Sequence, residues 1–92
     1  MWLQAAEIQT TVGDIWLSRN EHGKATSSFR GAAKTYEVRL DKLLEAAQLR
    51  ERIGDITRPE LAIQDYEKAR ALYGNAGKEE DQRRVQRKIW DL

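Results

Sequence analysis

The chain has 92 residues but no cysteine, and it has only one proline and one histidine. Because cysteine is absent, the chain cannot form disulfides, a thiolate nucleophile or a cysteine-ligated zinc site. No apolar run is longer than three residues, so we expect no membrane span, and the N-terminus lacks the pattern of a signal peptide. These absences predict a single small cytoplasmic domain over residues 1–92.

An excess of one charge is missing as well, since 16 Lys and Arg face 15 Asp and Glu. A nearly neutral chain lacks the broad positive field that favours nucleic-acid binding. Bases gather only near the C-terminus, behind a short acidic run, at Arg83, Arg84, Arg87 and Lys88. Acids at the start of a helix and bases at its end also complement the helix dipole. We therefore interpret this segment as a solvated helix, and RNA or anionic-membrane binding is the third of three alternatives.

Reactive side chains are too few and too scattered for a catalytic or metal site. His22 is the only histidine and lies in a predicted turn. The acidic run 79–81 begins a predicted helix, where acids complement the dipole. Gly74 and Gly77 follow a predicted helix and not a strand, so they indicate a helix stop and not a phosphate-binding loop. We expect no enzymatic activity, no cofactor and no bound metal.

Two sequence patterns occur twice. V-G-D-I at 12–15 returns as I-G-D-I at 53–56, and A-x-x-x-F-x-x-A at 25–32 returns as A-x-x-x-Y-x-x-A at 62–69. The first offset is 41 residues and the second is 37, so the second copy is shorter by about one helical turn. Repeats of this length are typical of helical hairpins that stack on one another.

Apolar residues recur at helical spacing throughout and predict five helices, at about 2–19, 24–39, 42–55, 59–73 and 78–90. Thr57 to Glu60 has the form of a capping box with proline in the first turn, which places the cap at Thr57 or Arg58. Between the second and third helices, the predicted break depends on Asp41 as an N-cap. Because the apolar spacing continues across it, one long helix over 24–53 is the alternative.

The first predicted helix has one apolar face, which consists of Ala5, Ile8, Val12, Ile15 and Trp16. Gly13 lies within this helix, where glycine costs up to about 1 kcal/mol relative to alanine. We therefore expect Gly13 to face a helix that leaves no room for a side chain.

These features resemble the tetratricopeptide repeat, in which small and aromatic residues recur at fixed positions of a helical hairpin. The matching residues are Gly13, Trp16, Ala25, Phe29 and Ala32 in the first unit, and Ala62, Tyr66 and Ala69 in the second. The resemblance implies an all-α array of about five antiparallel helices. Its parts would be one unit at about 2–40, a second at about 41–77 and a terminal helix at about 78–92. The second unit departs from the family pattern near residues 56–61, where the missing turn falls.

In proteins of this kind the first helices of the hairpins line a concave groove that holds a peptide or helix of another protein. The resemblance therefore implies a protein-interaction module. The corresponding groove positions are Glu7, Thr10, Thr11, Asp14, Leu17 and Ser18 in the first unit and Gln48, Glu51, Arg52 and Asp55 in the second. Acids outnumber bases among them, which predicts a preference for a basic or neutral segment. The first unit offers no Lys, Arg or Asn there, so a carboxylate clamp is not expected.

The runner-up is a self-associating structural or scaffold domain. Both ends of the chain are apolar, where the caps of such arrays are usually polar. We therefore expect either a piece of a longer protein or a homo-oligomer. Trp2 and Trp90 are the candidate contact residues, because aromatic residues are enriched in interface cores.

Overall fold

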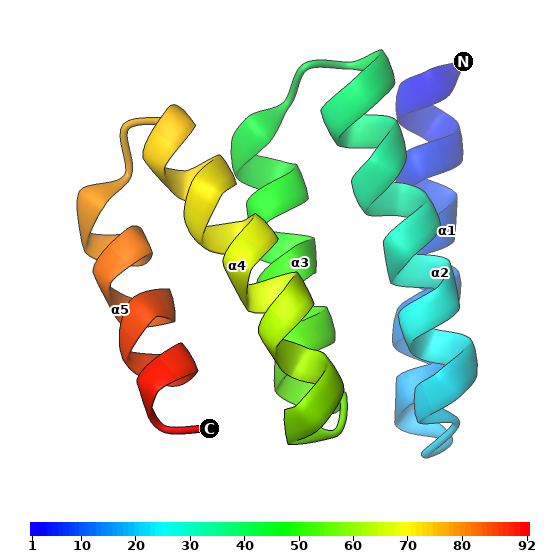
Figure 1. The fold of residues 1–92 in the computed structure, drawn as a ribbon. Coiled ribbons are helices and arrows are strands. Elements are labelled where there is room, and N and C mark those ends of the chain that lie inside the picture. The colour runs from blue at the N-terminus through cyan, green and yellow to red at the C-terminus, as the bar shows by residue number, and fades with distance from the viewer.

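The computed structural model describes residues 1–92 and consists of α-helices with one short π-helical segment. The elements are α1 (Trp2–Ser18), α2 (His22–Lys34), η1 (Thr35–Arg39), α3 (Leu43–Ile56), α4 (Pro59–Asn75) and α5 (Glu79–Trp90). Successive helices run antiparallel, and α1 and α5 lie at opposite edges of the array (Figure 1). The five predicted helices are thus confirmed, and their ends agree with the prediction to within two residues when η1 is counted with α2.

The chain breaks between α2 and α3 as predicted, but not by the predicted device. α2 continues into η1, and residues 40–42 separate η1 from α3. Lys42, and not Asp41, occupies the N-cap position of α3. Asp41 has a φ of 51°, and this left-handed conformation turns the chain. The Lys42 N–H then donates to the Tyr36 carbonyl at 2.8 Å, which closes the turn.

The predicted capping box at the start of α4 does not form. The N-cap is Arg58, with no side-chain hydrogen bond, while Pro59 takes the first helical position as predicted. The Thr57 hydroxyl instead donates to the Ile53 carbonyl at 2.6 Å. Threonine readily bonds a carbonyl one turn back, so its hydroxyl serves the end of α3 and not the start of α4.

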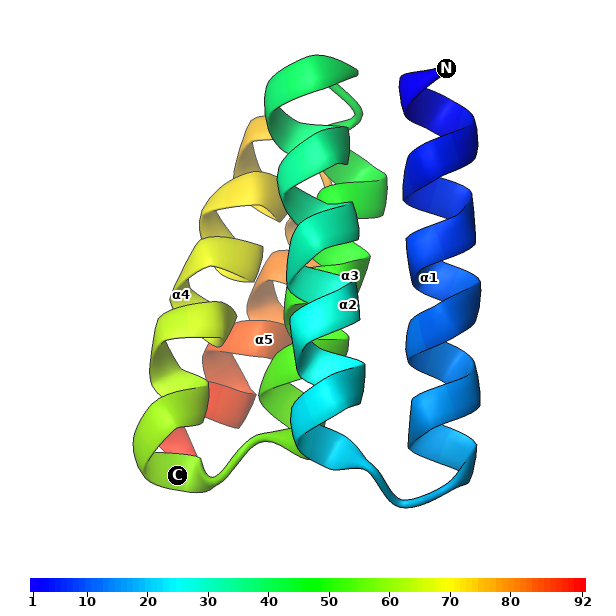
Figure 2. The same ribbon diagram turned by 90° about the vertical axis from the view of Figure 1, so that its right-hand side faces the viewer.

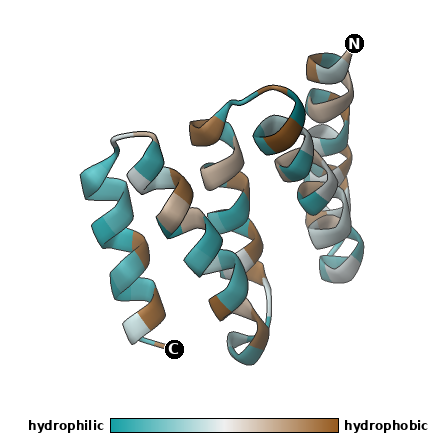
Figure 3. Ribbon diagram, turned by 45° about the horizontal axis from the view of Figure 1, so that its top comes forward, coloured by the Kyte–Doolittle hydropathy of each residue, from teal (hydrophilic) through white to brown (hydrophobic).

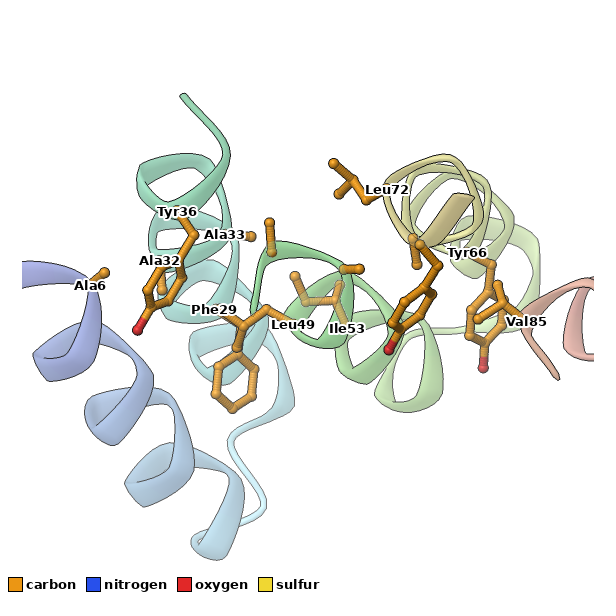
Figure 4. Packing of buried hydrophobic residues seen from close by; sticks show 14 of the residues in the cluster. Ala6, Phe29, Ala32, Ala33, Tyr36, Leu49, Ile53, Tyr66, Leu72 and Val85 are labelled. Carbon is orange, nitrogen blue, oxygen red and sulfur yellow. The ribbon is translucent and has the colours of Figure 1, made fainter. Parts of the chain in front are cut away.

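Each hairpin closes on a contact between a glycine and an aromatic ring. A Cβ atom built on Gly13 would lie 2.5 Å from Cε1 of Phe29, and one built on Gly54 would lie 2.5 Å from Cε1 of Tyr66. Both rings are buried in the core that runs through the array (Figure 4). The expectation for Gly13 is confirmed, and Gly54 is its structural counterpart.

The turn missing from the second hairpin lies at its closed end. Ser18 ends α1 five residues after Gly13, whereas Ile56 ends α3 only two residues after Gly54. In both hairpins the aromatic ring lies seven residues after the start of the second helix. The shortening therefore removes the end of α3 and part of the turn, and it leaves the glycine–aromatic contact unchanged.

The apolar face predicted for α1 exists, but most of it is exposed. Ile8, Val12 and Ile15 are 63%, 38% and 47% exposed, and Ala5 is exposed as well. The buried residues of α1 are Ala6 and Gly13, on the face that packs against α2. Figure 2 shows α1 beside α2, with no further helix on its outer side.

Some glycines of this fold face an aromatic ring and others face open space, and comparing them tests the close contact directly. We expect Gly13→Ala and Gly54→Ala each to lower the free energy of unfolding by about 1–3 kcal/mol, because the new methyl group overlaps an aromatic ring. Gly23→Ala is the matched control, since a Cβ there meets nothing within 4 Å. It should stabilise the chain by up to about 1 kcal/mol through helix propensity. Urea unfolding measures all three, and equal effects at the three positions would contradict the contact.

Candidate functional site

A cation covers each aromatic ring and links one hairpin to the next helix along the array. The Arg52 guanidinium of α3 lies over the Phe29 ring, 4.4 Å from its centroid. It also donates a hydrogen bond to Asp14 on α1. Arg52 therefore connects both helices of the first hairpin to the first helix of the second.

The same arrangement recurs one hairpin later. The Lys88 ammonium of α5 lies 5.9 Å from the centroid of the Tyr66 ring and 3.0 Å from Oδ1 of Asp55. The Tyr66 hydroxyl donates to the same carboxylate at 2.6 Å. Because Asp55 follows Gly54 as Asp14 follows Gly13, α5 stands to the second hairpin as α3 stands to the first.

Glu51 is the centre of the polar cluster between α3, α4 and α5. Its side chain is almost fully buried and accepts hydrogen bonds from the Tyr73 hydroxyl at 2.8 Å, the Arg84 guanidinium at 2.8 and 2.9 Å, and the Lys88 ammonium at 2.7 Å. Burial by itself would raise the pKa of Glu51, but these donors outweigh it and lower the pKa to about 2. Burial and the bond to Glu51 raise the pKa of Tyr73, so both side chains keep their charge states near neutral pH.

Most charged residues of the predicted groove therefore pair with one another or with α5. Asp14 pairs with Arg52, Asp55 with Lys88, and Glu51 with Arg84 and Lys88. Glu7 is the one charged groove candidate without an ion pair. The excess of acids in the sequence thus produces little free negative charge on this face, which weakens the predicted preference for a basic segment.

The uncharged groove candidates lie mainly on α1 and use their hydroxyl protons within that helix. Thr10 donates to Ala6, Thr11 to Glu7 and Ser18 to Ile15, each to a main-chain carbonyl. Leu17 is half-buried and packs against the core. Thr10 and Gln48 line a pocket of about 200 Å³ at the α1–α3 boundary, together with Tyr36, Glu45, Leu49 and Arg52.

The bases of α5 do not form a continuous positive face. Arg84 and Lys88 turn toward α3 and bind Glu51, whereas Arg83 and Arg87 are exposed. α5 is nevertheless largely hydrophilic along its length (Figure 3). Since Arg83 also pairs with Glu79, three of the four bases hold ion pairs, which leaves little support for nucleic-acid binding here.

An apolar triplet with spacing 4 and 3 occurs on α1 and α3, the first helices of the two hairpins, and again on α5, which follows the second hairpin. Its members are Ile8, Val12 and Ile15 on α1, Leu49, Ile53 and Ile56 on α3, and Val85, Ile89 and Leu92 at and beyond α5. On α3 the triplet lies in the core and α2 packs against that helix; on α5, Val85 is buried and α4 packs alongside. The triplet on α1 has no such neighbour and is exposed. Periodicity alone identifies the triplet but not whether another helix covers it.

The two tryptophans proposed for self-association are both accessible. Trp2 is 45% exposed, and the Arg39 guanidinium lies over its ring at 4.8 Å from the centroid. Trp90 is 75% exposed at the end of α5. They lie on α1 and α5, the helices at opposite edges of the array (Figure 1).

Comparison of the chain with family models, with curated proteins and with solved structures finds no match. None of the helices combines the length and the apolar character needed to span a bilayer. No group of three or more His, Cys, Asp or Glu side chains is placed to hold a metal ion. The function of the chain therefore has to be inferred from its own geometry.

The Glu51 cluster predicts a specific loss of stability in acid. Because the pKa of Glu51 is about 2 in the folded chain and ordinarily about 4.5, its contribution is complete above pH 4.5 and is lost as the pH falls toward 2. We expect this contribution to be on the order of 2–3 kcal/mol. Urea unfolding between pH 2 and 7 should show a shallower pH dependence for Glu51→Gln than for the wild type. Glu7→Gln removes a carboxylate without an ion pair and is the control, and identical slopes for the two variants would contradict the assignment.

Proposed function

We propose that this chain is a non-enzymatic protein-interaction module of tetratricopeptide-like hairpins, and that it binds a helix of another polypeptide on the apolar triplet of α1. The repetition of the triplet supports this proposal. On α3 the equivalent residues lie in or against the core and α2 packs on that helix, and on α5 Val85 is buried and α4 packs alongside. The chain itself therefore illustrates the kind of ligand that this surface fits, which is a helix presented as α2 is presented to α3.

The exposed area is large enough to stabilise such a contact. The exposed fractions of Ile8, Val12 and Ile15 together correspond to about one and a half full side chains. Fully burying one such side chain contributes about 1.5–3 kcal/mol, so covering all three contributes about 2–4 kcal/mol. The triplet itself contains no charged side chain.

The concave groove supports the same function less strongly. Three of its acidic candidates and Arg52 already hold ion pairs, and an incoming peptide would have to replace these contacts. The 200 Å³ pocket beside Thr10 and Gln48 is the part of the groove that a partner side chain can still enter. The groove is therefore a secondary surface in this proposal.

A duplicated chain tests whether the triplet accepts a helix. A second copy of residues 1–41 fused ahead of Met1 keeps the 41-residue repeat, so that the second Met1 takes the position of Lys42 in the repeat. The added α2 should then cover the inner α1. We expect the free energy of unfolding to exceed that of the parent chain by about 2–4 kcal/mol or more. Equilibrium urea unfolding measures the difference.

One substitution placed in either copy separates the contact from other effects. Ile8→Glu in the inner copy, which is the original α1, should remove most of the gain in stability, because a carboxylate would be buried under the added α2. Ile8→Glu in the outer copy leaves the residue exposed and should preserve the gain. Equal effects in the two copies, or a duplicated chain no more stable than the parent, would contradict the proposed docking surface.

Self-association is the alternative in which a second copy supplies the helix. The exposed Trp2 and Trp90 favour it, since large exposed aromatic side chains are typical of interfaces. Sedimentation of the 92-residue chain distinguishes the two cases. A dimer that Ile8→Glu disperses would identify a second copy as the partner, whereas a monomer at high micromolar concentration indicates a different polypeptide.

A further inference from the structure

A basic pocket lies between α2, α3 and α4, and none of its lining residues belongs to the groove candidates or to the triplet of α1. Its volume is about 410 Å³, and no apolar side chain lines it. Four bases line it, from three different helices, against a single acid; they are Arg30, Lys34, Arg50 and Lys68, and the acid is Asp65. The lining thus carries three more positive than negative charges.

The single carboxylate of this pocket binds two guanidinium groups, one buried and one exposed. Asp65 accepts from Arg50 Nη1 at 3.3 Å and from Arg30 Nη2 at 2.9 Å. Arg50 is only 3% exposed and Asp65 only 4%, so these two side chains form a buried ion pair, whereas the Arg30 side chain is 44% exposed. Because Asp65 neutralises only one of the two guanidinium groups that it binds, Arg30 adds an uncompensated positive charge at the surface of the pocket.

Arg50 also has a donor that nothing satisfies. Its Nε is buried and has no hydrogen-bond partner. Buried polar groups of folded proteins are nearly always paired, and an exception calls for an explanation such as a ligand. The Asp65 carboxylate, already shared with Arg30, does not supply this partner.

Two lysines add to the positive charge of this lining. Lys34 and Lys68 are exposed and form no ion pair within the pocket. Lys34 lies one turn after Arg30 on α2, and like charges at this spacing destabilise a helix. An internal salt bridge between the hairpins needs only the arginines and Asp65, and the two lysines leave further positive charge unpaired beside it.

We propose that this pocket binds a phosphate group, either as inorganic phosphate or as a small phosphomonoester. Guanidinium groups bind phosphate oxygens through paired N–H donors, and lysine ammonium groups add positive charge at the rim. Asp65 holds Arg30 and Arg50 in place, and the exposed Arg30 keeps its other donors free for the anion. The volume is in the range of small-ligand sites and admits a phosphate with a short attached group. This site is independent of helix docking on α1.

Nuclear magnetic resonance titration of the intact 92-residue chain tests the site. Inorganic phosphate is added at constant ionic strength, and the amide and arginine Nε–H signals are followed. We expect saturable shifts confined to residues around the pocket, with the Nε–H signals of Arg30 and Arg50 among them. Phosphoserine, titrated in parallel, distinguishes a site for a monoester from one for the free anion by the tighter of the two dissociation constants.

A matched pair of double variants separates a specific site from general attraction. Lys34→Ala with Lys68→Ala should weaken phosphate binding by about tenfold or more, because two charged contacts are lost. Arg19→Ala with Arg87→Ala removes the same net charge from exposed positions elsewhere and should leave the dissociation constant unchanged. Lowering the pH until phosphate is a monoanion should weaken binding to the wild type.

Two results would overturn the proposal. Shifts that grow linearly with phosphate and do not saturate would show that the cluster only joins the hairpins. Equal weakening in the two double variants would show that binding reflects net charge and not this pocket. The lysine substitutions leave the Asp65 ion pairs intact, so they should not disturb the fold. Unchanged arginine signals in the free lysine variant would verify this.

Discussion

The contact between a glycine and an aromatic ring is the constraint on which the rest of this fold depends. Only a residue without a side chain allows the ring of Phe29 or Tyr66 to lie directly on the opposite helix. The ring then presents its other side to the next helix of the array, where a cation covers it. Because an aspartate follows each glycine, the same cation also finds a carboxylate. One close approach thus fixes both the hairpin and its link to the next helix.

The repeat also shows how α5 differs from α1 and α3. Since Lys88 takes the place of Arg52, the residue equivalent to Gly54 is Trp90. An indole at this position leaves no room for a second helix placed as α2 is on α1. Trp90 is accordingly exposed, while α5 directs Arg84 and Lys88 back toward α3. The α1 edge, with its uncovered triplet, is the edge that suits a further helix of the repeat's own kind.

Local features of the sequence predicted the five helices well, whereas long-range contacts could not be predicted. Helical spacing identified five helices, and the cost of an internal glycine identified the close contact at Gly13. Thr57 has two possible uses for its hydroxyl, and its choice of the Ile53 carbonyl depends on the end of α3. Glu51 was placed in a groove, but its burial follows from α5, whose approach to α3 no local pattern reveals. The basic pocket was missed for the same reason, since three helices contribute to it.

The helices at the two edges of the array are held by different forces, so the two edges are not equivalent. α5 has a single fully buried apolar side chain, Val85, so its attachment depends strongly on the polar cluster around Glu51. Such a cluster is stabilising only while every donor and acceptor in it is paired, and a competing ligand there would have to break those pairs. α1 packs through Ala6 and Gly13 and leaves a second, apolar face unpaired. The helix that we propose to dock on α1 would therefore bury surface that is now in water, without breaking any contact of the chain.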